Sequence, residues 1–101
     1  MKRVMVRYKV RPECADENVR LIQAVYEQLA RERPAGLRYA TFRLDDGVSF
    51  VHVASHESDD GSNPLTELAA FKAFTAEIRS RCEEAPVSVE LREIGSYAFF
   101  D

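Results

Sequence analysis

The order in which hydrophobic periodicity changes along the chain constrains the fold more than any other feature. Alternating apolar and polar residues indicate a strand, whereas apolar residues three or four positions apart indicate a helix. The two periods follow one another in the order strand, helix, strand, strand, helix, strand. The corresponding ranges are 3–10, 13–33, 37–44, 48–56, 64–82 and 87–94.

Turn residues separate these ranges. Pro34 and Gly36 end the first predicted helix. The stretch 45–47, Asp-Asp-Gly, predicts a tight hairpin, because Asp and Gly tolerate positive φ angles. Asn63 and Pro64 suit the N-cap and the first position of the second helix.

The order βαββαβ predicts an α+β, ferredoxin-like fold. Right-handed crossovers would place both helices on one face of a four-stranded antiparallel sheet. The 101 residues fit a single domain, 1–101. A core of this size is small, so burial against a second copy would stabilise it.

The charge and hydropathy of the chain exclude several classes of function. A net charge of −3 and a pI near 5.4 argue against a nucleic-acid partner, which needs a basic surface, and the aromatic pattern that stacks RNA bases is missing. No apolar run approaches the ~20 residues that cross a membrane, so we expect a cytoplasmic protein with no membrane partner. Cys14 and Cys82 are either reduced thiols or a disulfide.

Both histidines lie in the stretch FVHVASHES, residues 50–58. On a strand rising ~3.3 Å per residue, His52 and His56 would be about 13 Å apart. Two nitrogens on one zinc ion must each lie within about 2.1 Å of it. We therefore expect no shared metal, and we also expect no cofactor. Each imidazole is instead a candidate general base, since histidine titrates near neutral pH.

The alternation within each strand assigns its residues to one face of the sheet or the other. The apolar residues predicted to face the helices are Val4, Val6, Tyr8, Val10, Val51, Val53, Val87, Val89 and Leu91. For strand 37–44 either Leu37 and Tyr39 or Ala40, Phe42 and Leu44 would fit. The opposite face would carry Met5, Arg7, Lys9, Phe50, His52, Ala54, His56, Glu90 and Arg92. Such a mixture of polar and apolar groups is typical of a pocket lining.

Four stretches carry a resemblance to a known family: VRYKVRPE, RPAGLRYATFRLDDG, FVHVASHES and AFKAF. In them the chain resembles the antibiotic-biosynthesis-monooxygenase-like group of dimeric α+β barrel proteins. The resemblance implies two subunits stacked sheet to sheet, with a cavity between helices and sheet that binds aromatic or polyketide-like compounds. Some members oxidise quinols with oxygen and no cofactor, and related members bind or degrade haem. This chain lacks Trp, has His56 where members often carry Trp or Tyr, and has no histidine near Leu65.

Two functions remain open. The first is a cofactor-independent, monooxygenase-like enzyme in which His52 or His56 deprotonates a small aromatic or quinol-type compound. The second is a non-catalytic, homodimeric binding or accessory protein. The pocket is predicted to be bounded by His52, His56, Phe50 and the second helix.

Three further residues are candidate ligand contacts. Arg7 and Arg92 are candidates for holding a carboxylate or enolate oxygen, although pairing with Glu90 across the sheet would explain them equally. Asn63 is a candidate ligand contact as well as a helix cap.

Overall fold

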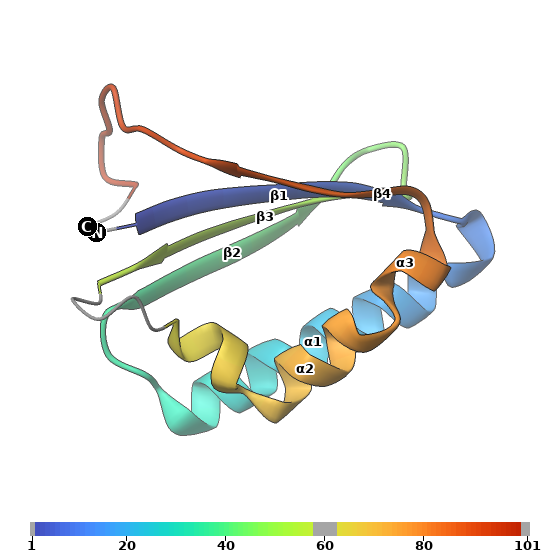
Figure 1. The fold of residues 1–101 in the computed structure, drawn as a ribbon, viewed down its shortest axis with the longest axis horizontal. Helices are drawn as coiled ribbons and strands as arrows, with labels where there is room; N and C mark the ends of the chain where they lie inside the picture. Colours follow the sequence, from blue (N-terminus) through green and yellow to red (C-terminus); the bar gives the residue numbers. More distant parts are fainter. Residues whose placement is uncertain (1, 58–62, 100–101) are drawn as a thin grey trace.

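The computed structural model describes residues 2–57 and 63–99. Nine elements follow one another along the chain (Figure 1). They are β1 (Lys2–Val10), η1 (Pro12–Cys14), α1 (Ala15–Glu32), β2 (Leu37–Arg43), β3 (Ser49–His56), η2 (Pro64–Glu67), α2 (Ala69–Ala76), α3 (Ile78–Arg81) and β4 (Cys82–Glu90).

The four strands form one antiparallel sheet in the order β2-β3-β1-β4. The helices α1, α2 and α3 lie together on one face of this curved sheet (Figure 1). This arrangement confirms the predicted α+β, ferredoxin-like fold. Side chains from the helices and the sheet meet in the space between the two layers, which holds both the core and the site described below.

Helix α1 packs on the sheet through a narrow face. Its buried residues are Ala15, Asn18, Ile22 and Val25, at the spacing of one helical stripe. Asn18 is fully buried on this otherwise apolar stripe. The helix ends at Arg33, which adopts the left-handed conformation with φ of 46° and bonds its N–H to the Leu29 carbonyl.

The prediction of one continuous helix over 64–82 is wrong. Leu68 is extended, with ψ of 133°, and separates the short turn η2 from α2. The Gln28 side chain of α1 accepts a hydrogen bond from the Ala70 N–H at 2.8 Å. A side chain of α1 therefore caps the first turn of α2. The hydrophobic periodicity of residues 64–82 alone does not reveal this cap. A second break at Glu77 separates α2 from α3.

The predicted facing of β3 is also wrong. Residues directly opposite each other in antiparallel strands share a face. Val6 pairs with His52 and Tyr8 pairs with Phe50, so the histidine and the phenylalanine point toward the helices. Val51 and Val53 take the opposite face. On β2, Leu37 and Tyr39 share the helix-facing side with His56 and Ala54, which settles the alternative left open by the sequence.

Strand β4 differs from its prediction in both bounds and facing. It begins at Cys82 instead of residue 87, and a bulge next to Tyr8 shifts its register against β1. Pro86 lies at this bulge on an edge strand, where its missing N–H is tolerated. Val87 and Val89 pair with Arg7 and Met5, so they point away from the helices and are exposed.

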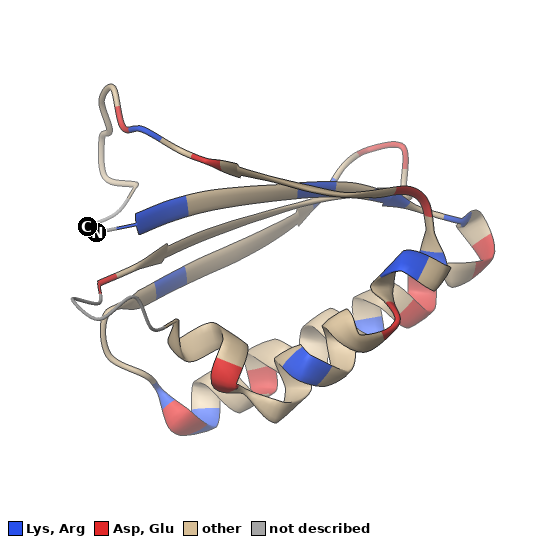
Figure 2. Ribbon diagram, viewed as in Figure 1, with Lys and Arg blue, Asp and Glu red and all other residues tan. Residues whose placement is uncertain are grey.

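Acidic and basic residues are interspersed along the helices (Figure 2). Among the described residues, no helix is long and apolar enough to cross a membrane.

Candidate functional site

His52 lies at the centre of a hydrogen-bonded cluster between the sheet and the helices. Its Nε2 is 2.8 Å from the Tyr8 hydroxyl, on β1. Its Nδ1 is 2.5 Å from the Tyr39 hydroxyl and 3.1 Å from the Thr41 hydroxyl, both on β2. The imidazole is 5% exposed, so these three hydroxyls account for both of its ring nitrogens. The cluster also includes Asn18, whose amide donates to the Tyr8 oxygen at 2.9 Å.

A buried cation sets the direction of these hydrogen bonds. The Nε of Arg81 donates to Oδ1 of Asn18 at 3.3 Å, which leaves the Asn18 amide N–H₂ to donate to Tyr8. Tyr8 accepts from Asn18, and we infer that it gives its own proton to Nε2 of His52, its other hydrogen-bond partner. The neutral imidazole then carries its proton on Nδ1 and donates toward Tyr39. The chain of donors therefore runs from Arg81 to Tyr39.

Burial keeps the cluster uncharged apart from Arg81. Desolvation lowers the pKa of His52 to about 4, because the imidazolium form would be buried away from water. Desolvation raises the pKa of Tyr8 and of Tyr39 well above the ordinary phenol value, and hydrogen bonds from Asn18 and Thr41 offset only part of this effect. At neutral pH the imidazole is neutral and the phenols keep their protons.

A cavity of about 220 Å³ adjoins this cluster. Its walls are mostly apolar and come from β1, β3 and the α2–α3 region; they include Val6, Ala54, Leu65, Phe71, Phe74 and Ile78. A cavity of about 150 Å³ is enough to bind benzene. This cavity therefore has room for one substituted aromatic ring or a compact bicyclic compound.

The polar residues that line the same cavity are Tyr8, Tyr39, His52, His56, Asn63 and Thr75. His56 is 6% exposed, and within the described ranges its Nδ1 has no hydrogen-bond partner. A buried, unpaired nitrogen is costly unless a ligand or water satisfies it. Asn63 uses its Oδ1 to accept from the Leu65 N–H at 3.0 Å, so the predicted capping role is present in the structure.

No protein-family model and no curated protein matches this sequence. Solved structures do match it. The structure of an antibiotic biosynthesis monooxygenase aligns with a TM-score of 0.76 at 18% identity, over 94% of this chain and all of the other. Rv0793 from Mycobacterium tuberculosis aligns with a TM-score of 0.75 at 17% identity, over 94% of this chain and 96% of the other.

A variant of SnoaB, a cofactor-independent oxygenase from Streptomyces nogalater, aligns with a TM-score of 0.69 at 15% identity, over 96% of both chains. The chain has the fold of the antibiotic biosynthesis monooxygenases. These neighbours support the resemblance read from the sequence. At such identities the match establishes the monooxygenase fold alone, and the chemistry must be argued from the residues of this chain.

Within this monooxygenase fold, the predicted site residues divide into two groups. His52, His56 and Asn63 line the cavity. Phe50 is buried behind it, stacked on Tyr8 with ring centroids 5.6 Å apart. Arg7 lies on the opposite face of the sheet, paired with Val51 and Val87.

Arg92 follows the end of β4 and is exposed. The structure therefore brings neither Arg7 nor Arg92 to the cavity. Among the described residues, no group of His, Cys, Asp or Glu side chains is arranged to hold a metal ion.

Sequence reasoning missed the polar partners of His52. The sequence predicted Tyr8 and Tyr39 only as core or interface residues, and it did not single out Asn18 or Arg81. Asn18 and Arg81 did carry a usable signal, since each is a polar residue at a buried position of a helix. Buried polar side chains are hydrogen-bonded in nearly all proteins, so each pointed to an interior partner.

Proposed function

We propose that the protein is a homodimeric, cofactor-independent monooxygenase-like enzyme that acts on a small phenolic or quinol-type compound. The observation that carries this proposal is an apolar cavity lined in part by His56, a residue whose buried Nδ1 has no partner among the described residues. An apolar pocket with a few convergent polar groups is the usual form of a small-molecule site. The monooxygenase fold adds support, because one of its members is a cofactor-independent oxygenase.

His56 is the proposed general base. A phenolic hydroxyl that donates to its Nδ1 would satisfy the buried nitrogen and place the proton for transfer. The resulting phenolate delocalises charge onto its ring carbon, which becomes electron-rich enough to react with oxygen. The apolar walls, among them Phe71 and Phe74, exclude water from this carbanion.

His52 has a different proposed role. Both of its ring nitrogens are already bonded to protein hydroxyls, so it orients Tyr8 and Tyr39 and takes no proton from the substrate. Because the His52 Nδ1–H donates to the Tyr39 oxygen, the Tyr39 proton remains available to an oxygen atom in the cavity. Tyr39 would thereby stabilise negative charge that develops on the substrate.

The proposed reaction needs molecular oxygen as its only co-reactant. The deprotonated substrate passes an electron to oxygen, and the two radicals combine to form a carbon–oxygen bond. The peroxide O–O bond then breaks as the ring carbon loses its hydrogen. One oxygen atom remains in the new carbonyl, and the other leaves as water with the two hydrogens lost by the substrate.

Oxygen uptake with α-naphthol and a panel of hydroquinones tests this proposal. His56→Ala should reduce the rate about a hundredfold, the usual contribution of a general base. Ser55→Ala is the matched control, since Ser55 is the buried neighbour whose side chain takes the other face of β3. Equal uptake by His56→Ala and the control would rule out the catalytic role of His56.

The hydrogen bonds that occupy both ring nitrogens of His52 favour a second candidate function, a non-catalytic protein that binds a small aromatic ligand. An imidazole with both nitrogens occupied is fully explained as a structural group. The two candidates differ in one measurement. Saturable binding of α-naphthol without oxygen uptake would support the binding protein and exclude the enzyme.

The homodimer rests on the sheet face turned away from the helices. This face carries Val87, 61% exposed, and Val89, 40% exposed, beside Met5 and Arg7. Tyr97, beyond β4, is also almost fully exposed. Exposed apolar groups gathered on one face are typical of an interaction surface. Sedimentation equilibrium at two protein concentrations should give about twice the chain mass of 11.5 kDa, and a monomer at both would contradict the dimer.

A further inference from the structure

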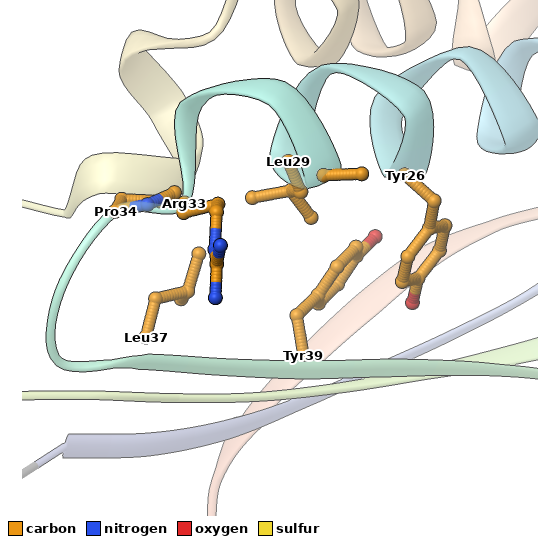
Figure 3. A pocket seen from close by; sticks show the side chains of 7 residues that line it. Tyr26, Leu29, Arg33, Pro34, Leu37 and Tyr39 are labelled. Atoms are coloured by element: carbon orange, nitrogen blue, oxygen red, sulfur yellow. The ribbon is translucent and has the colours of Figure 1, made fainter.

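A second concave region lies outside the cavity, between the end of α1 and β2. We call it the outer groove; it is lined by Tyr26, Leu29, Arg33, Pro34, Leu37 and Tyr39 and has a volume of about 370 Å³. Figure 3 shows Leu29 and Tyr26 reaching down from α1 toward Leu37 and Tyr39 on β2. The groove is therefore a slot between a helix and a strand, with apolar side chains on both walls.

Arg33 supplies the only cationic side chain of this lining. Its side chain extends from the end of α1 toward β2, beside Leu37 (Figure 3). Within residues 2–57 and 63–99, no carboxylate lies within ion-pair distance of Arg33. The adjacent carboxylate of Glu32 accepts a hydrogen bond from Gln28 instead. The guanidinium thus faces the groove with its charge unneutralised.

The backbone at Arg33 strengthens this observation. Its φ of 46° lies in the left-handed region, where the end of a helix usually has Gly. A side chain there costs free energy that Gly would avoid. The side chain that this backbone position carries lies in the groove.

A ring pair that spans the two walls, Tyr26 from α1 and Tyr39 from β2, determines what shape fits. Tyr26 and Tyr39 are stacked, with centroids 5.1 Å apart and planes 11° from parallel. The Tyr26 hydroxyl bonds to the Thr41 hydroxyl at 2.8 Å, which holds the pair in place. A flat apolar ring can pack beside such a stack, between the leucines of the two walls.

We propose that the outer groove binds a small aromatic carboxylate, with its carboxylate on Arg33 and its ring between Leu29 and Leu37. A planar guanidinium matches a carboxylate through two parallel hydrogen bonds. One unpaired cation matches one negative charge, and the leucines match the apolar ring. This site uses neither His52 nor His56, and it shares Tyr39 with the inner cavity described above.

Binding of β-naphthoate, followed by amide chemical shifts in NMR, tests this site. The largest shifts should fall on Leu29, Arg33 and Leu37 and should saturate. Val6 and Phe74 line the cavity beside His52 and do not line the outer groove. Chemical-shift changes centred on these two residues would place the ligand in that cavity and overturn the proposal. The neutral isostere β-naphthamide should bind at least tenfold more weakly, and equal binding would refute the role of the carboxylate.

Substitution of Arg33 completes the test. Arg33→Gln should weaken β-naphthoate binding by about tenfold, the usual effect of losing a charge-assisted hydrogen-bond pair. Arg31→Gln is the matched control: it removes the same charge from the same helix end, but Arg31 does not line the groove. Equal losses in both variants would mean that only the general charge matters, and unchanged binding in Arg33→Gln would exclude the site.

Discussion

The hydroxyl of Tyr8 lies 2.8 Å from Nε2 of His52, and this contact joins the two central strands of the sheet beneath the helices. Asn18 on α1 and Arg81 on α3 extend the same chain of hydrogen bonds. The cluster therefore connects both strands to α1 and α3. Its polar groups occupy positions that an apolar core would otherwise fill.

Removing the Tyr8 hydroxyl should destabilise the protein. Tyr8→Phe would leave the Asn18 amide and Nε2 of His52 buried without their partner. Each unsatisfied group costs about 1–3 kcal/mol, so the free energy of unfolding in urea should fall by at least that much. Tyr97→Phe is the matched control because Tyr97 is 96% exposed. A Tyr8→Phe variant as stable as this control would show that the cluster contributes nothing to stability.

Stability should fall on acidification because of His52. Its folded pKa of about 4 lies below the unfolded value near 6.5, so the unfolded state binds the extra proton between these pH values. The contribution, about 3 kcal/mol, is complete above pH ~6.5 and is lost as the pH falls toward ~4.

Urea unfolding at several pH values measures this effect, and His52→Gln should flatten the dependence over that range. Tyr8 from β1 and Tyr39 from β2 face the imidazole and stay neutral throughout. The cation Arg81 lies beyond Asn18. An NMR titration that gave His52 a pKa near 6.5 would contradict the expected pH dependence.

Filling the cavity should abolish ligand binding without unfolding the protein. Ala54→Leu adds three carbons to the cavity wall on β3. The affinity for α-naphthol should fall at least tenfold, since the added side chain takes the space of the ring. Ala40→Leu is the control, because Ala40 pairs with Val53 on the other face of the sheet. Isothermal calorimetry reports the affinity, and normal binding by Ala54→Leu would show that the ligand lies elsewhere.

Arg33→Gly should stabilise the chain while it removes the groove cation. Glycine adopts positive φ without the steric cost of a Cβ, so the unfolding free energy should rise by about 1 kcal/mol. Gly36→Ala should act in the opposite direction: its φ is 75°, and a Cβ there would lie 3.3 Å from the Glu57 carbonyl oxygen. Thermal unfolding compares the two variants, and a lower melting temperature for Arg33→Gly would contradict the strain at this position.

A charge on the outer sheet face should separate the proposed dimer. Val87→Lys would place a lysine beside Arg7, and two copies packed through this face would bring like charges together. Sedimentation equilibrium should then give the monomer mass. Gln23→Lys on α1 changes the charge equally at an exposed position of the helical layer and should leave the dimer intact. A Val87→Lys dimer as stable as the control would place the interface elsewhere.

The order of elements could be predicted because each segment carries its own signal. The hairpin at 45–47 is an example: Gly47 has φ of 80°, and the Asp46 carboxylate accepts hydrogen bonds from Val48 and Ser49. Helix breaks were harder to predict, because the cap on α2 comes from Gln28, more than forty residues earlier.

The facing of β3 could not be predicted from its own residues. Both sets of alternate positions contain apolar side chains, Phe50 and Ala54 on one face and Val51 and Val53 on the other. Only the pairing with β1 distinguishes them. The histidines were correctly grouped with Phe50 and Ala54 on one face of β3, but that face was assigned to the wrong side of the sheet.

The two-sided character of β3 gives the hydrogen-bonded cluster a further consequence. A misfolded form with β3 displaced by one residue would still bury Val51 and Val53, so apolar burial alone discriminates poorly between it and the native fold. In that form His52 would leave Tyr8, Tyr39 and Thr41 without their common partner. Burying these hydroxyls without hydrogen-bond partners costs free energy, and this cost widens the free-energy gap between the native and the displaced form. The buried polar cluster of this small protein thus favours the native strand register over alternatives that a purely apolar core would also accommodate.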